Sequence, residues 1–358
     1  MINLSMFFKD KWKIWGTVCI FYITSVGEIN AKKQGIFDIF YEKEKITITL
    51  ETDINVMMEN RRDINEHVGK LTYEDNDEEV IWDVKVSIRG RYRRMFSKGV
   101  PPLKIDFKKS QLKDRGLKAY DDLKLVTLFA EDKRAAYQIL LKEFLVYKMY
   151  NLISPYSYRV KLLEVVYKDS YSGDSFKEWA FVIEDTDQLE DRMKIKEIKE
   201  KIDLEEIPLD TTVNNVAAMF QYFIGNGDWK FYQPKNIKLF EKEGKIMMVP
   251  YDFDFSGMVG APYSVPNNLY GRRTVKDRVY LGEVSDLNNL SEAIMLFFKV
   301  KDALLELVDQ TKPLGRSQKK EIKEFIESFY DDIQYRKQNN LDMKGILFQL
   351  MAEKDSKK

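Results

Sequence analysis

The sequence predicts an α+β protein with a strand-rich N-terminal lobe followed by a helix-rich C-terminal lobe. Between residues 35 and 109, the segments ITITLETDI, VIWDVKVSIRG and PPLKIDFKK alternate apolar and polar residues, as half-buried strands do. Nearer the C-terminus, LSEAIMLFFKVKDALLELV and KKEIKEFIESFYDDI have the apolar spacing of amphipathic helices. The chain has 358 residues, of which 44% are hydrophobic. Because it is longer than one core usually becomes, we expect two lobes with a cleft between them.

The remaining elements lie between these two regions. A helix is predicted from Asp132 to about Ile153, followed by strands in YRVKLLEVVY and WAFVIED, which the turn-rich segment DSYSGDS separates. Residues 188–201 form a charged helix or an exposed connection, and residues 211–224 form a helix. The segments IKLF and KIMMVPYDFDF are predicted to pair as strands. The predicted division of the chain is a signal peptide at 1–27, a strand-rich lobe with one long helix at 28–190, and a helix-rich lobe at 191–354.

The N-terminus has the parts of a secretory signal peptide. Three lysines (Lys9, Lys11 and Lys13) precede an apolar run over residues 14–23, and small residues follow it. The alternative is an uncleaved N-terminal anchor, and no later apolar segment reaches the roughly 20 residues that a membrane span needs. We therefore expect an exported protein, which is periplasmic, displayed on the cell surface or secreted.

Composition excludes several kinds of chemistry. Lys plus Arg and Asp plus Glu both number 58, so no basic excess favours a nucleic-acid partner. The only cysteine, Cys19, lies in the apolar run, and the only histidine, His67, lies in a polar stretch. A Ser-His-Asp triad and a zinc site of His and Cys ligands are therefore not expected. The remaining chemistry suits Mg²⁺ or Mn²⁺ with phosphates, or a carboxylate pair that acts on sugars.

The densest group of candidate site residues lies in IGNGDWKFYQPKNIKLF and MMVPYDFDF. Asp228 follows an apolar helix, Asn236 begins the next strand, and Asp252 and Asp254 end the strand after that. A hairpin would place Asn236 beside Asp252, with Asp228 facing them. Phosphoryl transfer needs such a set, with Asp228 accepting the hydroxyl proton and Asn236 and Asp252 holding the metal on nucleotide phosphates. Asp254 points to the same strand face as Asp252 and is a further metal ligand candidate. The alternative is ordinary turn chemistry, which also favours Asn, Asp and Gly.

The strand-rich lobe offers candidate partners for the phosphates. In PPLKIDF, Lys104 alternates away from its apolar neighbours, as a phosphate-binding lysine or any lysine on a solvated strand face would. Glu143 is centred in the apolar face of a predicted helix, where an unpaired carboxylate would cost several kcal/mol. Its candidate partners are Lys104 and Arg89, and Arg89 is also a candidate phosphate contact. The third alternative is that Glu143 reaches solvent at the lobe edge.

Taken together, these motifs resemble the CotH-type secreted protein-kinase-like family and related exported bacterial proteins. The resemblance covers roughly residues 35–260 and rests on SIRGRYRR, PPLKIDF, FVIED, NGDWKFYQPKNIKL and VPYDFDFSG, in that order. It implies a two-lobed atypical protein-kinase-like fold that uses ATP and Mg²⁺ or Mn²⁺. It also implies that Asp228 is the catalytic residue, that Asp252 and Asn236 are metal ligands, and that Lys104 is the nucleotide lysine.

The chain departs from the family pattern at two places. Kinase-type loops usually place the asparagine five positions after the aspartate, where this chain has Gln233, and Asn236 comes three residues later. The family's Arg-Gly pair is usually followed by a small polar residue, whereas Arg91 and Tyr92 follow Gly90 here. The first departure concerns the metal ligand and the second concerns the grip on the phosphates.

Three functional hypotheses follow from the sequence. The first is an exported, metal-dependent, kinase-like enzyme that transfers phosphate from a nucleotide to a protein or a cell-envelope polymer. The second is a non-catalytic kinase-like module for envelope assembly or interaction, in which the surface near Arg272 and Arg273 would matter and Asp228 would not. These arginines lie in the loop GAPYSVPNNLYGRRT, where they are candidate contacts for an anionic substrate or simply two exposed side chains. The third is a carbohydrate-active protein that uses Asp228 with Glu184 or Asp252. In the third, the sugar-stacking candidates are Trp229, Phe231 and Tyr232.

Overall fold

A computed structural model describes residues 33–90, 92–96, 98–128, 132–200, 207–267, 271–282 and 287–338. The chain divides into two units, 1–33 and 34–358, and all that follows concerns the second. The predicted signal peptide, residues 1–27, lies outside the described residues. Among the helices of the described part, none is long and apolar enough to cross a membrane.

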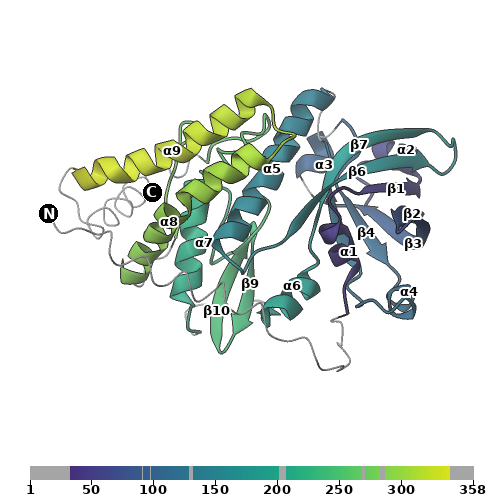
Figure 1. The fold of residues 1–358 in the computed structure, drawn as a ribbon, viewed down its shortest axis with the longest axis horizontal. Coiled ribbons are helices and arrows are strands. Elements are labelled where there is room, and N and C mark those ends of the chain that lie inside the picture. Colours follow the sequence, from purple (N-terminus) through teal and green to yellow (C-terminus); the bar gives the residue numbers. More distant parts are fainter. Residues whose placement is uncertain are drawn as a thin grey trace, which may run out of the picture. The chain divides into compact units, whose positions relative to one another are not determined.

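Seven strands close into a barrel, seen on the right of Figure 1. Neighbouring strands are antiparallel in the order β1-β2-β3-β4-β5-β7-β6, and β6 returns to β1 as a parallel pair. Inward-facing side chains fill the barrel, as the alternating burial along β4 illustrates. The strands are β1 (Thr47–Thr52), β2 (His67–Asp75), β3 (Glu78–Ile88), β4 (Leu103–Phe107), β5 (Asp122–Val126), β6 (Val160–Asp169) and β7 (Ser175–Ile183).

Short helices lie around the barrel, and α5 connects β5 to β6. The residue before α5, Asp132, caps it by accepting hydrogen bonds from the amides of Arg134 and Ala135. The helices of this region are α1 (Ile36–Glu42), α2 (Ile54–Glu59), α3 (Tyr92–Phe96), α4 (Lys109–Asp114), α5 (Lys133–Ile153) and α6 (Thr186–Met193).

The rest of the chain forms a small sheet and three further long helices. In the sheet the order is β10-β9-β8, and in Figure 1 helices α7, α8 and α9 lie next to α5. A second apolar core joins α5, α7, α8 and α9 to β9 and β10. The elements are β8 (Lys196–Glu197), α7 (Thr211–Phe223), β9 (Ile237–Lys242), β10 (Lys245–Pro250), α8 (Leu287–Gln310) and α9 (Arg316–Gln338).

The α+β class is confirmed, but the prediction of a two-lobed atypical protein-kinase-like fold is wrong. The strands do not form the open sheet of a separate lobe, because β1 pairs with β2 on one side and with β6 on the other. This last pairing brings together residues such as Thr47 and Glu164, which are 117 positions apart. Alternating hydrophobicity indicates which segments are strands, but it does not say which of them pair. The predicted division of the chain between residues 190 and 191 stays a prediction.

Candidate functional site

A pocket of about 810 Å³ lies where the ends of the barrel strands meet the β9–β10 hairpin. This volume is in the range of pockets that hold small molecules and cofactors. Six of the seven predicted site residues line it, four of them from the segment after α7 and two from earlier in the chain. These six are Arg89, Glu143, Asp228, Asn236, Asp252 and Asp254.

The hairpin places Asn236 and Asp252 at the same edge of the pocket. Strands β9 and β10 pair with Ile237 opposite Pro250, so the residues just outside this pair are neighbours. The amide of Tyr251 donates to the carbonyl of Asn236 at 3.0 Å. Both Asn236 and Asp252 have left-handed backbones, with φ of 54° and 61°. Such a conformation is unfavourable for residues other than glycine and is often found at functional sites.

Asp228 is held in place by its neighbours in the loop that follows α7. The side chain of Asn226 accepts a hydrogen bond from the Asp228 amide at 2.9 Å. The amide group of Asn236 donates to the Asp228 carboxylate at 3.0 Å and to its carbonyl at 2.7 Å. Lys235 forms an ion pair with the same carboxylate. Both carboxylate oxygens of Asp228 therefore have a partner.

Asp252 differs from Asp228, because nothing in the described part of the chain pairs with its carboxylate. Its backbone amide donates to the Tyr147 hydroxyl at 2.9 Å, which leaves the side chain open to the pocket. Burial in the pocket raises the pKa of Asp252 to about 7, and the negative charges of Asp254 and Glu143 add to this effect. A cation that binds here would restore the ionised form.

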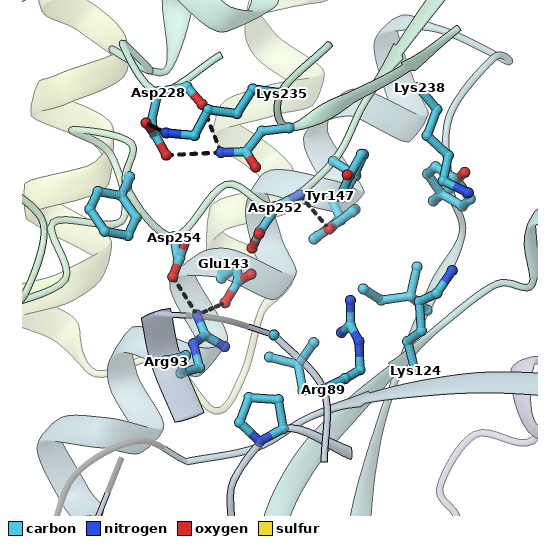
Figure 2. Close-up of a pocket in the computed structure, with 18 of the residues that line it drawn as sticks. Arg89, Arg93, Lys124, Glu143, Tyr147, Asp228, Lys235, Lys238, Asp252 and Asp254 are labelled. Atoms are coloured by element: carbon cyan, nitrogen blue, oxygen red, sulfur yellow. Dashed lines mark hydrogen bonds and ion pairs between the residues drawn. The ribbon is translucent and has the colours of Figure 1, made fainter. Parts of the chain in front are cut away.

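Below Asp252 lies a buried ionic network centred on Arg93 (Figure 2). Arg93 donates to the Glu143 carboxylate at 2.6 Å and lies 3.3 Å from the Asp254 carboxylate. The Tyr263 hydroxyl donates to Asp254 at 2.8 Å and accepts from Arg93 at 3.1 Å. Although burial opposes its charge, the neighbouring carboxylates hold the pKa of Arg93 well above its usual value. The partner of Glu143 is thus Arg93, rather than the Lys104 or Arg89 that the sequence suggested.

Lys104, the seventh predicted site residue, is not among the residues that line the pocket. Its amine donates to Asp106 at 2.8 Å and lies 3.8 Å from Asp122. The lysine that reaches the pocket is Lys124, which lies opposite Lys104 in the β4–β5 pair. Lys124 was missed because DDLKLV carries no motif. The two lysines lie side by side on one face of the sheet, and the position of β5 between β4 and β7 brings Lys124 to the pocket.

The two lysines differ in charge environment. In the described part of the chain, Lys124 has no hydrogen-bond or ion-pair partner. Burial, followed by the charges of Lys238 and Arg89 and opposed by Asp122 and Asp185, lowers the pKa of Lys124 to about 8. Burial also lowers the pKa of Lys104, but the Asp106 hydrogen bond and nearby carboxylates outweigh it and raise the pKa overall.

This difference predicts selective acylation of Lys124 by a small reagent. At pH 8, Lys124 should have on the order of 100-fold more of the reactive neutral amine than an ordinary lysine. We expect it to be acetylated at least about tenfold faster than Lys104, with a rate that reaches half its maximum near pH 8. The measurement is quantitative mass spectrometry of peptides after brief exposure to acetic anhydride over pH 6–10. Equal rates at the two lysines would show that Lys124 is not the more acidic ammonium.

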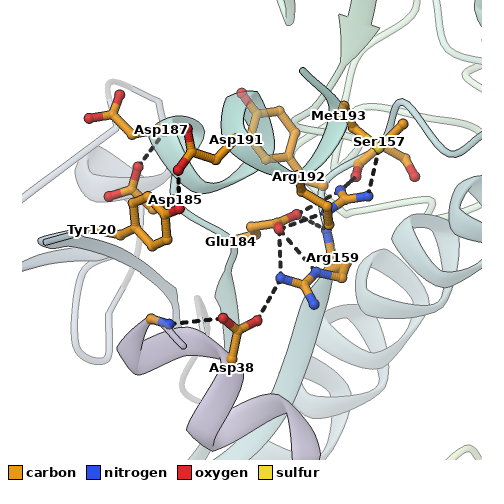
Figure 3. Close-up of polar contacts among 12 residues, drawn as sticks. Asp38, Tyr120, Ser157, Arg159, Glu184, Asp185, Asp187, Asp191, Arg192 and Met193 are labelled. Carbon is orange, nitrogen blue, oxygen red and sulfur yellow. Dashed lines mark hydrogen bonds and ion pairs between the residues drawn. The ribbon is translucent and has the colours of Figure 1, made fainter. Parts of the chain in front are cut away.

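The remaining candidates of the sequence analysis lie away from the pocket or in the core. Figure 3 shows Glu184 bound by Arg159 and Arg192, so this carboxylate is not available as a partner for Asp228. Arg272 is buried and donates to the backbone carbonyls of Gly225 and Asp277, whereas Arg273 is exposed. Trp229 and Phe231 are core residues, Tyr232 is exposed, and His67 lies half-buried beside Asp53.

The donor set at the pocket suits a magnesium or manganese ion that arrives with a phosphate. In the part of the chain that the structure describes, no group of three or more His, Cys, Asp or Glu residues is arranged to hold a metal. Mg²⁺ does not require one in phosphate-transfer sites, where one or two carboxylates, substrate phosphates and water complete its shell. The Asp252 carboxylate and the side-chain oxygen of Asn236 are hard oxygen donors that accept no hydrogen bond from the described residues.

No protein-family model matches the chain, and no curated protein and no solved structure matches it. The resemblance to the CotH-type family therefore rests on the sequence motifs alone.

Proposed function

We propose that the pocket binds a nucleoside triphosphate with Mg²⁺ or Mn²⁺ and transfers its terminal phosphate to a hydroxyl of a protein or cell-envelope polymer. The observation that carries this proposal is an arginine and an aspartate that share the pocket without pairing. Figure 2 shows Arg89 and Asp252 on opposite sides of the opening. Among the described residues, no carboxylate lies within ion-pair distance of Arg89, and no cation lies within that distance of Asp252.

An arginine and an aspartate that remain apart in a partly dehydrated pocket favour a ligand that satisfies both, and a bound cation would keep the aspartate ionised. The charged form of each side chain loses hydration there, and the loss is offset only when a counter-charge is bound. The separation leaves room for a group that offers oxyanions to Arg89 and a cation to Asp252. A metal-bound phosphate is such a group, because a guanidinium binds phosphate oxygens in a forked geometry and a divalent cation binds carboxylates.

The residues around this pair supply the remaining roles. Asp252 and Asn236 would hold the divalent cation, which would neutralise charge on the phosphate oxygens. Asp228 would accept the proton of the attacking hydroxyl, and it would exchange its bond with Lys235 for one with that hydroxyl. The Arg93–Glu143–Asp254 network lies behind them and fixes the end of the Asp252–Asp254 segment.

The test is a thermal-shift titration of the full chain with ATP and GTP, each with and without Mg²⁺ or Mn²⁺. A ligand that binds only the folded state raises the melting temperature. We expect a metal-dependent rise that EDTA removes. Replacing Asp252 by asparagine removes the charge that the cation needs, and we expect it to weaken binding on the order of 100-fold, or about 2.7 kcal/mol.

The matched control is Asp174→Asn, because Asp174 is exposed in the turn between β6 and β7 and does not line the pocket. This variant should bind nucleotide as the wild type does. The proposal fails if folded wild-type protein shows no shift with either nucleotide in the presence of metal, or if Asp252→Asn binds unchanged.

A second candidate function is a non-catalytic nucleotide-binding module. It is favoured by the ion pair between Lys235 and Asp228, which occupies the carboxylate that would act as the base. Incubation with a nucleotide labelled in the terminal phosphate separates the two functions. Transfer of the label to water or to an acceptor supports the enzyme, provided that Asp228→Asn prevents this transfer. Binding without any release or transfer of label supports the module.

A further inference from the structure

The pocket has two ends of different chemistry. Figure 2 places Lys124 and Lys238 at one end and Asp228, Arg93 and Asp254 at the other. Arg89 and Asp252 lie between these ends. If phosphates and cation occupy the middle, as in the proposed function, the transferred group faces Asp228. The rest of the nucleotide then points toward the two lysines.

Apolar side chains line the lysine end. Lys124 pairs with Ile183 of β7, and Ile183 also pairs with Val160 of β6, two residues after Tyr158. The register therefore gathers Ile183, Val126 and Tyr158 around Lys124, and all of these line the pocket. Aliphatic and aromatic side chains of this kind pack against the faces of a planar ring.

At this end one polar group has no partner. Lys238 is satisfied, since it forms an ion pair with Glu197 at 2.7 Å and donates to the Thr186 hydroxyl at 3.1 Å. Lys124 has no acceptor among the described residues, and although burial lowers its pKa to about 8, the amine is still mostly protonated at pH 7. Leaving such a donor without an acceptor costs free energy, so a ligand atom that accepts its hydrogen bond is strongly favoured.

Resting on the proposed function, we propose that this end binds the nucleobase and that Lys124 selects guanine over adenine by donating a hydrogen bond to guanine O6. Guanine presents a carbonyl oxygen beside N7, and a lysine ammonium is a frequent partner of this pair of acceptors. Adenine carries an amino group at the same position, which would place a donor against a donor. A site with an unpaired donor rejects the analogue that lacks the acceptor.

The experiment compares the affinities of the full chain for GTP, ITP and ATP, each with Mg²⁺, by isothermal titration calorimetry. ITP keeps the O6 carbonyl and lacks only the 2-amino group of guanine. We expect GTP and ITP to bind at least about tenfold tighter than ATP, which is the usual effect of one good base contact. Lys124→Met should remove this preference mainly by weakening GTP and ITP. Lys104→Met, on the neighbouring strand outside the pocket, should keep it.

Two outcomes would overturn the inference and leave the proposed function standing. One is equal affinity of the wild type for GTP and ATP. The other is an equal loss for all three nucleotides in Lys124→Met, since this would mean that Lys124 contacts phosphate. A wild type that binds none of the nucleotides would overturn both proposals. Because the wild-type preference is measured by itself, equal affinity for GTP and ATP overturns the inference even if Lys124→Met does not fold.

Discussion

Replacing Arg93 by methionine is expected to lower the free energy of unfolding by about 3–5 kcal/mol. Arg93 is the cation that pairs with both Glu143 and Asp254, and the side chains of all three are almost completely buried. Methionine fills much of the same volume but leaves the two carboxylates without a counter-charge. A buried charge that loses its partner is among the most destabilising changes known. The measurement is urea unfolding followed by circular dichroism.

Two variants separate the loss of charge pairing from other effects of the Arg93 change. In Arg93→Met combined with Glu143→Leu, the main buried pair is replaced by apolar side chains, and we expect at least about half of the lost stability to return. The exposed Arg273, changed to methionine, is the control and should cost less than about 0.5 kcal/mol. If Arg93→Met costs no more than Arg273→Met, the network does not stabilise the fold.

Replacing Glu184 by alanine is expected to cost a similar amount, about 3–5 kcal/mol. Glu184 is fully buried, and its carboxylate accepts hydrogen bonds from Arg159 at 2.8 and 3.0 Å and from Arg192 at 2.9 and 3.0 Å. Arg159 also pairs with Asp38 of α1 at 2.8 Å (Figure 3). The change would leave two arginines without their shared anion, and it would leave a cavity.

A surface glutamate provides the matched control for this prediction. Glu164 lies on β6 and pairs with Lys177 at 3.3 Å on the partly exposed face of the barrel. Such surface pairs contribute about 0–1 kcal/mol, so Glu164→Ala should have a small effect. Thermal and urea unfolding of both variants give the comparison. Equal costs at Glu184 and Glu164 would mean that the buried carboxylate is no more important than the exposed one.

The sequence was sufficient to group the acidic side of the pocket because the residues involved are close in the chain. Asn236 and Asp252 lie just outside the two open ends of one hairpin. The open ends of a short hairpin are neighbours because the two strands are paired along their whole length. Asp228 lies nine positions before Ile237, the first residue of this hairpin. Local alternation and turn residues carry all of this information.

The basic side of the pocket could not be found in this way. Arg93 lies in a short helix and meets Glu143 from 50 residues away, and SIRGRYRR offers four arginines without indicating which one turns inward. Lys124 and Lys104 have the same alternating pattern, and only the arrangement of strands around the barrel decides which one faces the hairpin. For the same reason, the closed barrel itself could not be recognised from strand patterns.

The parallel contact between β1 and β6 determines when this chain can complete its folding. As the polypeptide emerges from the ribosome, β1 can pair with β2 almost at once, but its other edge must wait for residues 160–169. Until then the growing sheet has an open edge, which is the kind of surface that pairs with other chains. Closing a loop of this length is also entropically slow. A chaperone that covers the edge of β1 during synthesis would therefore protect the closure of the barrel, whose strand ends form one wall of the pocket.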